Sequence, residues 1–374
     1  MKKTKKIIVF GTRPEFIKLL PIIERLNQLG LQDKYIFIFT SQHTDLIYDL
    51  FDLFNFTPSY TIKPKNSNNS IVNSYSFILN KLQKIIDKIK SSYNIGVIIS
   101  QGDTTSCLSA ATIAFTNNIP FAHIEAGLRT NNLKSPFPEE YFRRIISLST
   151  SIHFAPTKIA YQNLIEENFS NEDIIITGNT IIDAITIIKE KTSKLSFKKL
   201  AKFKKKKNIL ITYHRRENQT NKFNTFISAI KNIAQQNEEY NFIWILHKNP
   251  YFVKIEMQQF FENEKNIQIL DHINVLDLYY LYNYSKLIIT DSVGIQEEAP
   301  SFNIPVIIIR SETERVESIN LGYSFLVKNI EKDLMKKFKT VLNSPFQNMN
   351  NPYGNGNASQ LIIEYIEEKF SFLL

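Results

Sequence analysis

Short apolar runs alternate with longer amphipathic stretches along most of this chain. Runs such as Lys6–Phe10 and Tyr35–Thr40 have the length and composition of buried strands. The segments Pro14–Leu29 and Ile71–Tyr93 instead repeat apolar residues at helical spacing, and Gly30 ends the first of them. Because strands and helices alternate, the pattern predicts an α/β fold with parallel sheets.

The alternation forms two series. The first continues with strands at Asn94–Ser100, Pro120–Ile124, Ser151–Pro156 and Asp173–Ile176, and with a helix at Lys158–Glu167. The second has strands at Ile209–Thr212, Phe242–Leu246, Ile267–Leu270, Lys286–Thr290 and Val306–Ile309, with helices at Asn221–Gln236, Val275–Ser285 and Ile295–Phe302. A lysine-rich run, Lys189–Lys207, is expected to link the two series.

We therefore predict two Rossmann-like domains with a central cleft. The first spans residues 1–185 and the second spans residues 186–357. The C-terminal helix, within residues 358–374, is amphipathic and is expected to pack back on the first domain.

Composition narrows the class of protein and its partners. Of 374 residues, 43% are hydrophobic and 22% are charged, as in ordinary globular proteins. The net charge is +9, but much of the excess lies in Lys189–Lys207, so nucleic-acid binding is not favoured. No apolar stretch has the length of an export signal or a membrane span. Cys107 is the only cysteine, which excludes an internal disulfide and fits a cytoplasmic protein.

Three acids follow predicted strands near the middle of the first series. Asp103 and Glu125 lie just beyond two neighbouring strands, and Glu139 follows in a loop that two prolines stiffen. In an open α/β sheet, ligands bind outside the carboxyl ends of the strands. The positions therefore predict a site that transfers protons.

Each acid also has a purely structural explanation. Asp103 would cap the following helix, and Glu125 would pair with Arg129. Glu139 would begin a solvated helix. This explanation fits any single acid as well as the functional one does, but three acids at convergent positions favour a functional site.

Two turns between a strand and a helix are suited to phosphate groups. Arg13 and Lys18 flank the start of the helix after the first strand, where backbone N–H groups already favour an anion. In the second domain, Ser292 and Gly294 follow a buried strand and are suited to a diphosphate. Glu298 lies in the first turn of the next helix, where a carboxylate accepts hydrogen bonds from ribose hydroxyls.

Histidines provide further candidates. His214 follows the first strand of the second domain beside two arginines and is a possible proton donor, and His247 is a comparable candidate at a strand end. His153 lies within an apolar run and is predicted to belong to the core. No spacing of His, Cys and carboxylate residues matches a metal site, so we expect no metal and no cofactor.

These residues fall into blocks that resemble the non-hydrolysing UDP-N-acetylglucosamine 2-epimerases of bacterial surface-polysaccharide synthesis. The blocks follow family order from near the N-terminus to about residue 330. They are Gly11-Thr-Arg-Pro-Glu15 with Lys18, Gln101-Gly-Asp-Thr-Thr105, His123-Ile-Glu-Ala-Gly-Leu-Arg-Thr130, Pro136-Phe-Pro-Glu-Glu140, Thr177-Gly-Asn-Thr180, His214-Arg-Arg-Glu217, Thr290-Asp-Ser292, Gly294-Ile-Gln-Glu-Glu-Ala-Pro300 and Thr313-Glu-Arg315.

The resemblance implies a GT-B-like arrangement of two domains that close over a UDP-sugar, usually in a homodimer. With the strand-end positions, it assigns catalysis to Asp103, Glu125, Glu139 and His214. It assigns UDP-sugar binding to Arg13, Lys18, Arg143, His247, Ser292, Val293, Gly294, Glu298 and Arg315. It implies a cytoplasmic isomerase that interconverts UDP-N-acetylglucosamine and UDP-N-acetylmannosamine for surface polysaccharides such as a capsule.

The chemistry of this reaction fits the candidate residues. No carbonyl group lies beside C2 of the sugar, so direct removal of its proton would leave an unstabilised carbanion. Departure of UDP from C1 makes the sugar cation-like, and the C2 proton is then lost easily to give a 2-acetamidoglucal. Carboxyl groups must serve both faces of C2, and fixed positive charge must stabilise the leaving diphosphate. We expect Asp103 and Glu125 to be the proton-transfer pair, with Glu139 assisting.

The chain departs from the family pattern at several positions. Val293 replaces a second glycine, Tyr213 a glycine before the histidine, Phe142 an asparagine and Val316 a proline. Val293 is expected to narrow the approach to the diphosphate, and Tyr213 to reshape the pocket wall. 

Activation by a second substrate molecule is also expected to differ. Many bacterial members of the family bind a second UDP-N-acetylglucosamine near a Gln-His segment. Gln42 and His43 are present here, but Thr44 replaces the usual arginine. We therefore expect activation to be weakened or absent.

Four other functions remain open from the sequence. They are epimerisation of another UDP-2-acetamido sugar, glycosyl transfer on the shared scaffold, hydrolytic epimerisation, and sensing of a nucleotide sugar without turnover. Exchange of the C2 hydrogen with solvent distinguishes epimerisation from transfer and sensing. Free N-acetylmannosamine as the product would indicate the hydrolytic route.

Overall fold

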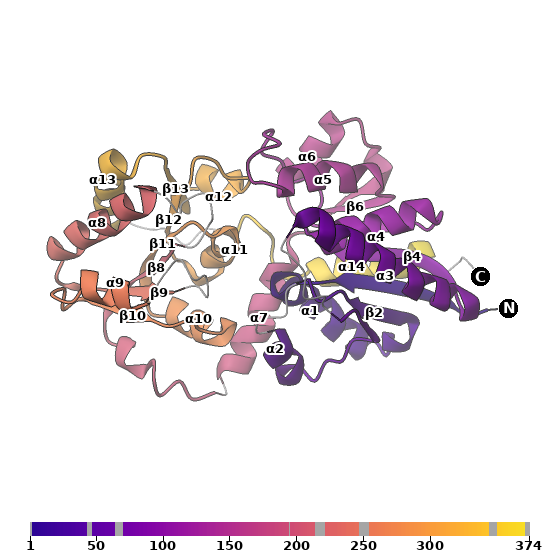
Figure 1. Ribbon diagram of the computed structural model, residues 1–374, viewed down its shortest axis with the longest axis horizontal. Coiled ribbons are helices and arrows are strands. Elements are labelled where there is room, and N and C mark those ends of the chain that lie inside the picture. The colour runs from indigo at the N-terminus through magenta and orange to yellow at the C-terminus, as the bar shows by residue number, and fades with distance from the viewer. Residues whose placement is uncertain are drawn as a thin grey trace. The chain divides into compact units, whose positions relative to one another are not determined.

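The structure is a computed structural model that describes residues 2–42, 47–63, 70–193, 195–213, 221–246, 254–343 and 350–370. The chain divides into two compact units. Unit 1 comprises Met1–Ala184 and Tyr353–Leu374, and unit 2 comprises Ile185–Pro352. Each unit is built around one sheet whose paired strands all run parallel (Figure 1).

Unit 1 contains a seven-stranded sheet in the order β3-β2-β1-β4-β5-β6-β7. Its strands are β1 (Thr4–Phe10), β2 (Tyr35–Phe39), β3 (Tyr60–Thr61), β4 (Asn94–Gln101), β5 (Phe121–Ile124), β6 (Ile152–Ala155) and β7 (Ile174–Ile176). The order reverses between β1 and β4, which makes this pair the switch point where ligands bind in doubly wound sheets. The core strands are covered on both faces, and Ile7–Phe10 is completely buried.

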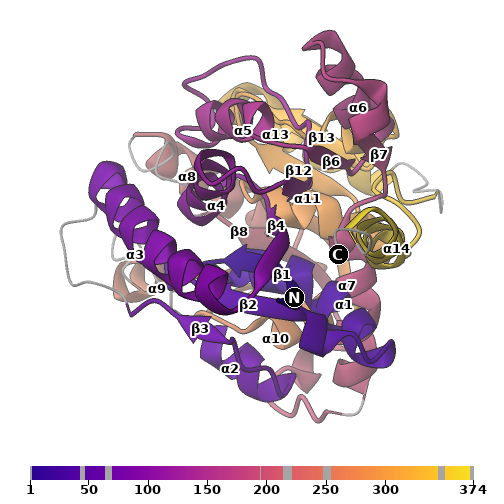
Figure 2. The ribbon, with the colours of Figure 1, turned by 90° about the vertical axis from the view of Figure 1, so that its right-hand side faces the viewer.

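Helices cover both faces of this sheet (Figure 2). They are α1 (Arg13–Gln28), α2 (Ile47–Leu53), α3 (Ile71–Ser92), α4 (Thr105–Thr116), α5 (Glu139–Leu148), α6 (Lys158–Glu166) and α14 (Ala358–Phe370). Helix α7 (Thr180–Ser193) begins in unit 1 and continues into unit 2. Helix α4 contacts both α3 and α5, whereas α14 contacts α1.

The C-terminal helix α14 is anchored in unit 1 at both ends. Near its start, the carboxylate of Asp183 accepts hydrogen bonds from the backbone N of Ser359 at 2.9 Å and from its Oγ at 2.7 Å. Near its end, Glu367 accepts hydrogen bonds from Lys6 and Tyr35, each at 2.7 Å. The last helix therefore belongs structurally to the same unit as the first strand.

Unit 2 repeats the same design with six strands in the order β10-β9-β8-β11-β12-β13. The strands are β8 (Lys207–Thr212), β9 (Tyr240–Ile245), β10 (Ile267–Leu270), β11 (Ser285–Thr290), β12 (Val306–Ile309) and β13 (Ser324–Val327). The helices are α8 (Asn221–Gln235), α9 (Lys254–Phe260), α10 (Val275–Tyr282), α11 (Val293–Glu298), α12 (Val316–Asn320) and α13 (Ile330–Asn343). Here the switch point lies between β8 and β11.

The predicted fold class, an α/β protein with two Rossmann-like domains, is confirmed. The boundaries predicted for the lysine-rich link are wrong, because Lys189 lies in the last turns of α7 and Lys207 begins β8. The sequence analysis also missed α7, α9, α12, α13, β3 and β13, whereas the helix start expected at Glu139 in the structural explanation is the start of α5. None of the helices in the described part of the chain is long and apolar enough to span a membrane.

Candidate active site

Two of the three predicted acids follow adjacent strands of unit 1. Asp103 follows β4 and Glu125 follows β5 directly, and these strands pair in register from Ile98–Phe121 to Gln101–Ile124. Glu125 has a left-handed backbone conformation (φ 68°) that turns the chain sharply at the end of the strand. The parallel sheet thus brings both carboxylates to one edge.

Glu125 lies at the centre of a buried polar group. Its side-chain oxygen Oε2 accepts hydrogen bonds from Lys18 Nζ at 2.5 Å and from Gln101 Nε2 at 2.7 Å. Lys18 reaches it from α1 and Gln101 from the end of β4. Because all three residues are buried, this ion pair is held in a fixed geometry by elements distant in sequence.

Asp103 is held by a second cation from a different helix. Arg143 of α5 donates to Asp103 at 2.8 Å and to Glu140 at 2.9 Å. The Arg143 and Glu140 side chains are almost completely buried, whereas the Asp103 side chain is 29% exposed. Asp103 is therefore the more accessible end of this network.

Glu139 is the first residue of α5 and is half-buried. It lies one helical turn before Arg143, on the same side of the helix. The helix that begins with Glu139 thus also carries the cation that holds Asp103. The structure brings Asp103 and the α5 acids to one region through Arg143.

The structural explanation offered for two of these acids is wrong. Thr104, not Asp103, caps α4, because its side chain accepts from the backbone N of Cys107 at 3.1 Å. Arg129 pairs with Glu167 at 2.7 Å, not with Glu125. 

Both histidines of the central strands of unit 1 are uncharged structural groups. His123 donates through Nε2 to the carbonyl oxygen of Gly102 at 2.7 Å, and burial lowers its pKa to about 4. This bond fixes the turn that precedes Asp103. His153 is buried against Phe169, as predicted, and burial lowers its pKa to about 3.

The turn between β1 and α1 packs tightly against the start of α4. A Cβ atom at Gly11 would lie 2.0 Å from Ser106 Oγ and 2.1 Å from Thr40 Oγ1, so only glycine fits there. Thr12 caps α1, and the half-buried Arg13 is the first residue of the helix. Arg13 therefore lies at the β1–β4 switch point, close to the turn that carries Asp103.

Gln42, a predicted activator-site residue, also contacts α4. Its side-chain oxygen accepts from the backbone N of Ser106 at 3.0 Å and from Ser106 Oγ at 2.8 Å. Gln42 therefore supports the N-terminus of the helix that follows Asp103. His43 lies outside the described residues, so the activator site stays a prediction.

In unit 2, the predicted UDP-binding residues follow β11 at the second switch point. Ser292 precedes α11, and Val293 and Gly294 form its first turn. The Oγ1 atoms of Thr290 and Thr212 lie 2.6 Å apart, which joins the ends of β11 and β8. Thr290 Oγ1 also accepts from the backbone N of Ser292 at 2.9 Å, so the end of β11 holds the turn in place.

Glu298 and Arg315 are each held by a neighbouring side chain. Tyr282 of α10 donates its hydroxyl to Glu298 Oε2 at 3.0 Å. The buried guanidinium of Arg315 donates to Glu297 at 2.5 Å. The sequence analysis missed Tyr282 because its partner lies 16 residues away on a different helix.

Two predicted consequences of family departures can be compared with the structure. Tyr213 is buried in the core of unit 2 and stacks on Phe226 at 4.2 Å between ring centroids, so its expected place in a pocket wall is wrong. Phe142 is likewise buried in the core of unit 1. His214 and His247 lie outside the described residues, and their roles stay predictions.

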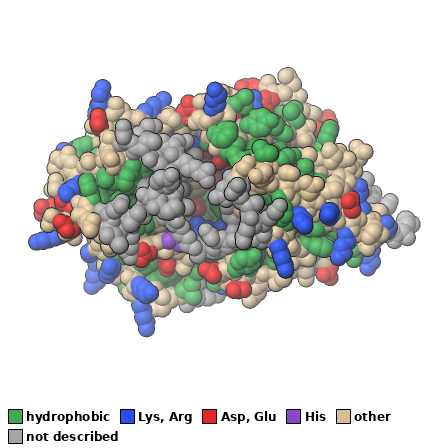
Figure 3. Space-filling view, in the orientation of Figure 1, with side chains coloured by type: hydrophobic (Ala, Val, Ile, Leu, Met, Phe, Trp, Pro, Cys, Tyr) green, Lys and Arg blue, Asp and Glu red, His purple; other side chains and the backbone are tan. Residues whose placement is uncertain are grey.

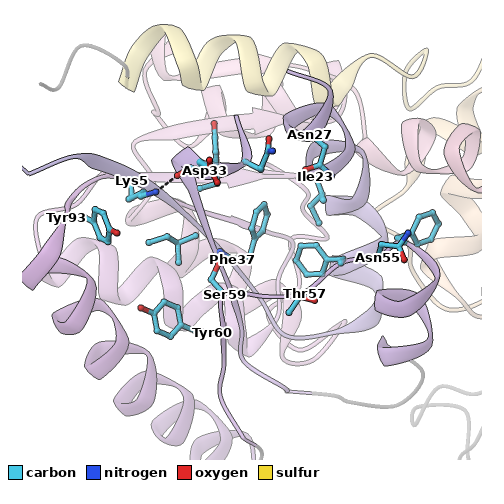
Figure 4. Close-up of a pocket in the computed structure, with 15 residues that line it drawn as sticks. Lys5, Ile23, Asn27, Asp33, Phe37, Asn55, Thr57, Ser59, Tyr60 and Tyr93 are labelled. Carbon is cyan, nitrogen blue, oxygen red and sulfur yellow. Dashed lines mark hydrogen bonds between the residues drawn. The ribbon is translucent and has the colours of Figure 1, made fainter. Parts of the chain in front are cut away.

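A groove of about 570 Å³ in unit 1 lies away from these acids (Figure 4). Its lining includes Lys5 near the start of β1, Tyr35 and Phe37 of β2, and Tyr60 and Tyr93. The acids lie at the carboxyl ends of the strands, so the groove is separate from the candidate site. Among the described residues, no group of His, Cys, Asp and Glu is placed to hold a metal ion.

Comparisons with known proteins agree with this arrangement. A family model described as UDP-N-acetylglucosamine 2-epimerase matches residues 30–367. The UDP-N-acetylglucosamine 2-epimerase of Neisseria meningitidis serogroup A is 35% identical over 371 residues, covering 96% of this chain and 98% of that protein.

Solved structures give the same result. A Neisseria meningitidis UDP-GlcNAc 2-epimerase bound to UDP-GlcNAc matches with a TM-score of 0.88 and 33% identity, covering 98% of this chain and all of that chain. The Methanocaldococcus jannaschii UDP-GlcNAc 2-epimerase in complex with UDP-GlcNAc and UDP has a TM-score of 0.85 and 31% identity, covering 98% and 99% of the two chains.

Proposed function

The chain belongs to the UDP-N-acetylglucosamine 2-epimerase family, and we propose that it interconverts UDP-N-acetylglucosamine and UDP-N-acetylmannosamine by eliminating and re-adding UDP. As a member of this family it is an isomerase. The observation that carries the mechanism is the pair of carboxylates, Asp103 and Glu125, at the ends of adjacent parallel strands, each held by a cation from a different helix.

In the first step, the bond between C1 and the diphosphate breaks and UDP leaves with the bonding electrons. A carboxylate takes the C2 proton, and the C1–C2 double bond of a 2-acetamidoglucal forms. In the second step, a carboxylic acid returns a proton to the opposite face of C2, and UDP re-adds to C1. We assign the two proton transfers to Asp103 and Glu125, with Glu139 assisting. Lys18 and Arg143 fix the directions in which the two carboxylates point.

The resemblance assigns UDP binding to residues of unit 2 and to Arg13 of the β1–α1 turn. Ser292, Val293 and Gly294 offer backbone N–H groups and a hydroxyl to the diphosphate at the start of α11, and Arg13 adds positive charge. Glu298 is suited to the ribose hydroxyls, with Tyr282 holding its other oxygen. We also assign UDP-sugar binding to Arg315, which is held by Glu297 of α11, and to His247, and a catalytic role to His214.

The departures from the family pattern favour the common substrate. Tyr213 and Phe142 replace small or polar residues of the family, but both are buried in hydrophobic cores. Of the departures discussed, Val293 is the one at the proposed diphosphate site. A panel of UDP-2-acetamido sugars tested for C2 inversion would show whether Val293 changes the preferred sugar.

The decisive experiment is incubation with UDP-N-acetylglucosamine in deuterated water, followed by NMR at C2. We expect UDP-N-acetylmannosamine to form with deuterium at C2, because the transferred proton exchanges with solvent through the carboxyl groups. Turnover without deuterium at C2 would contradict proton transfer, and free N-acetylmannosamine would indicate hydrolysis.

We also propose that the protein forms a homodimer through the outer face of α4 and α5. Phe115, Tyr141 and Leu148 on these helices are 65%, 50% and 74% exposed. Figure 3 shows hydrophobic side chains gathered on part of unit 1. Large exposed apolar groups on neighbouring helices are typical of an interface. Light scattering should give twice the chain mass of 43.5 kDa, and F115E/L148E should halve it.

The resemblance to enzymes of surface-polysaccharide synthesis supports a role in the cytoplasmic supply of capsule-type precursors. Loss of N-acetylmannosamine from the surface polymer on deletion of the gene would test this role.

A further inference from the structure

Glu15 is a buried carboxylate outside the three-acid set. Its side chain is on the first turn of α1, and the residue is only 1% exposed. The two carboxylate oxygens face two different segments of the chain. Oε2 accepts from the backbone N of Gly11 at 3.0 Å and from Thr12 Oγ1 at 2.8 Å, whereas Oε1 accepts from Thr104 Oγ1 at 2.7 Å.

The bonds to Gly11 and Thr12 form a capping box at the start of α1. Thr12 caps the helix and Glu15, three residues later, reaches back to the turn. This half of the arrangement fixes the β1–α1 turn, which includes Arg13. The capping box needs only Oε2 of Glu15, because both of its bonds are to that oxygen.

The bond to Thr104 has no part in capping α1. Thr104 is the N-cap of α4, and its hydroxyl accepts from the backbone N of Cys107 while donating to Glu15. A hydroxyl has one hydrogen to donate, and here the Glu15 carboxylate is its acceptor. Thr104 is the residue next to Asp103. Glu15 therefore connects two turns of the β1–β4 switch point.

We propose that Glu15 is a positioning residue that locks the β1–α1 turn, which carries Arg13, to the β4–α4 turn, which carries Asp103. The kinetic test of this inference rests on the proposed function, whereas the structural link itself does not. Only the carboxylate form accepts all three bonds, because protonation would force one of the two threonine hydroxyls to reverse its bond or lose it.

The charged and titratable groups of the neighbouring segments do not replace Glu15 as the acceptor of the Thr104 hydrogen bond. They are Arg13 and Lys18 on α1, Asp103 and Cys107 at the start of α4, and Glu125 after β5. Lys18 pairs with Glu125, and Arg143 pairs with Asp103. Burial raises the pKa of Glu15 to about 7, and its hydrogen bonds oppose this rise. The positioning group thus titrates near neutral pH.

The test compares E15Q, T104V, T104S and the double variant E15Q/T104V. In E15Q the amide keeps one acceptor for the capping box but cannot accept from Thr104. We expect kcat to fall about 10-fold or more at pH 8, with KM changed less than about threefold, because the loss concerns placement of Asp103. T104V should behave like E15Q, T104S should restore most of kcat, and the double variant should be no slower than the slower single variant.

The pH profile separates positioning from general loss of structure. The ratio of wild-type to E15Q kcat should be largest at pH 8 and should shrink toward pH 6, as the wild-type carboxylate becomes protonated. A ratio that is constant with pH, or wild-type kcat in both E15Q and T104V, would overturn the proposal.

A substrate-free readout keeps this test distinct from that of the proposed function. If the wild type does not turn over UDP-N-acetylglucosamine, the proposed function fails. The Glu15–Thr104 bond is then tested by melting temperature, where the shifts of E15Q and T104V should not add in the double variant. Additive shifts would overturn the inference, and non-additive shifts would support it.

Discussion

Units 1 and 2 have the same sheet topology but line their switch points with different chemistry. In unit 1, the residues after β4 and β5 are carboxylates, each bonded to a cation from a helix. In unit 2, the turn after β11 offers the hydroxyl of Ser292 and the backbone of Gly294. The carboxylate of Glu298, at the end of α11, is held by the neutral hydroxyl of Tyr282. Under the proposed function, one doubly wound design thus serves proton transfer in unit 1 and nucleotide binding in unit 2.

The difference extends to packing. The unit 1 turns are fitted closely to their neighbours, as the contacts of Gly11 show, whereas a Cβ at Gly294 would meet only Glu298 Oε1, at 3.8 Å, among the described residues. A site that moves protons needs fixed donors and acceptors, because small displacements are costly in rate. A site that binds a ligand needs room for it. The following predictions test this contrast.

The largest expected effect comes from the carboxylates of unit 1. Glu125→Gln should lower kcat by about 10²- to 10⁴-fold, because it removes a proton-transfer group. UDP should still bind, since Glu125 is not among the residues proposed to hold UDP. Turnover of UDP-N-acetylglucosamine and calorimetry with UDP measure the two effects.

Glu364→Gln is the matched control for this substitution. Glu364 is exposed on α14 and contacts only Gln360 among the hydrogen bonds of the described residues. It should leave both turnover and UDP binding unchanged. If Glu125→Gln abolished UDP binding as well, the division of labour between the units would be wrong.

Two glycines allow the packing contrast to be tested with one substitution. Gly127 follows Glu125 at φ +85°, and a Cβ there would lie 2.1 Å from the backbone oxygen of Ala160. Gly127→Ala should therefore cost about 3 kcal/mol of stability through strain and overlap. At Gly294 the nearest atom to an added Cβ is 3.8 Å away, so Gly294→Ala should keep stability and weaken UDP binding.

The single tryptophan makes the stability change measurable by unit. Trp244 is completely buried in unit 2, so its fluorescence follows the unfolding of that unit. In Gly127→Ala, circular dichroism should show a transition before the fluorescence change. Coincident transitions with wild-type midpoints would show that the close packing of unit 1 is not required.

A comparable energy is expected from the titration of Glu15 in unit 1. Its folded-state pKa of about 7 lies above the ordinary value of 4.5. The folded state therefore binds this proton more tightly, and the resulting stabilisation is complete below about pH 4.5 and lost as the pH rises through about 7. Relative to E15Q, the wild type should lose up to about 3 kcal/mol between pH 4.5 and 8. Urea unfolding of both proteins at several pH values measures this difference, and parallel curves would contradict it.

The contrast between the units also shows what the sequence could predict. Strands were recognised because parallel strands buried on both faces are nearly continuous apolar runs, as in Ile7–Phe10. Helix α7 was missed, and its end was assigned to the link because lysine is compatible with a helix as well as with a linker. Helix α13 was missed although its buried residues Ile330, Leu334 and Phe338 have helical spacing.

For the site, the sequence predicted which acids follow strands but not what holds them. Lys18 lies 107 residues from Glu125, and Arg143 lies 40 residues from Asp103. Such pairs depend on how helices pack on the sheet, which local patterns do not encode. Glu15 is a partial exception, because Thr12 and Glu15 have the spacing of a capping box, but its bond to Thr104 needed the structure.

The smallest expected effect concerns the neutral support of Glu298. Tyr282→Phe removes only the hydroxyl. The ring is buried beside Tyr279 and Phe302, so the packing should be retained. The loss of one hydrogen bond to a carboxylate should weaken UDP binding about 3- to 10-fold, with kcat nearly unchanged because no proton-transfer group moves. Tyr240→Phe, at the start of β9 in the same unit and packed against Phe338, is the control for loss of a tyrosine hydroxyl. If Tyr282→Phe instead lowered kcat as strongly as substitutions in unit 1, catalysis would extend to unit 2 and the contrast between the units would fail.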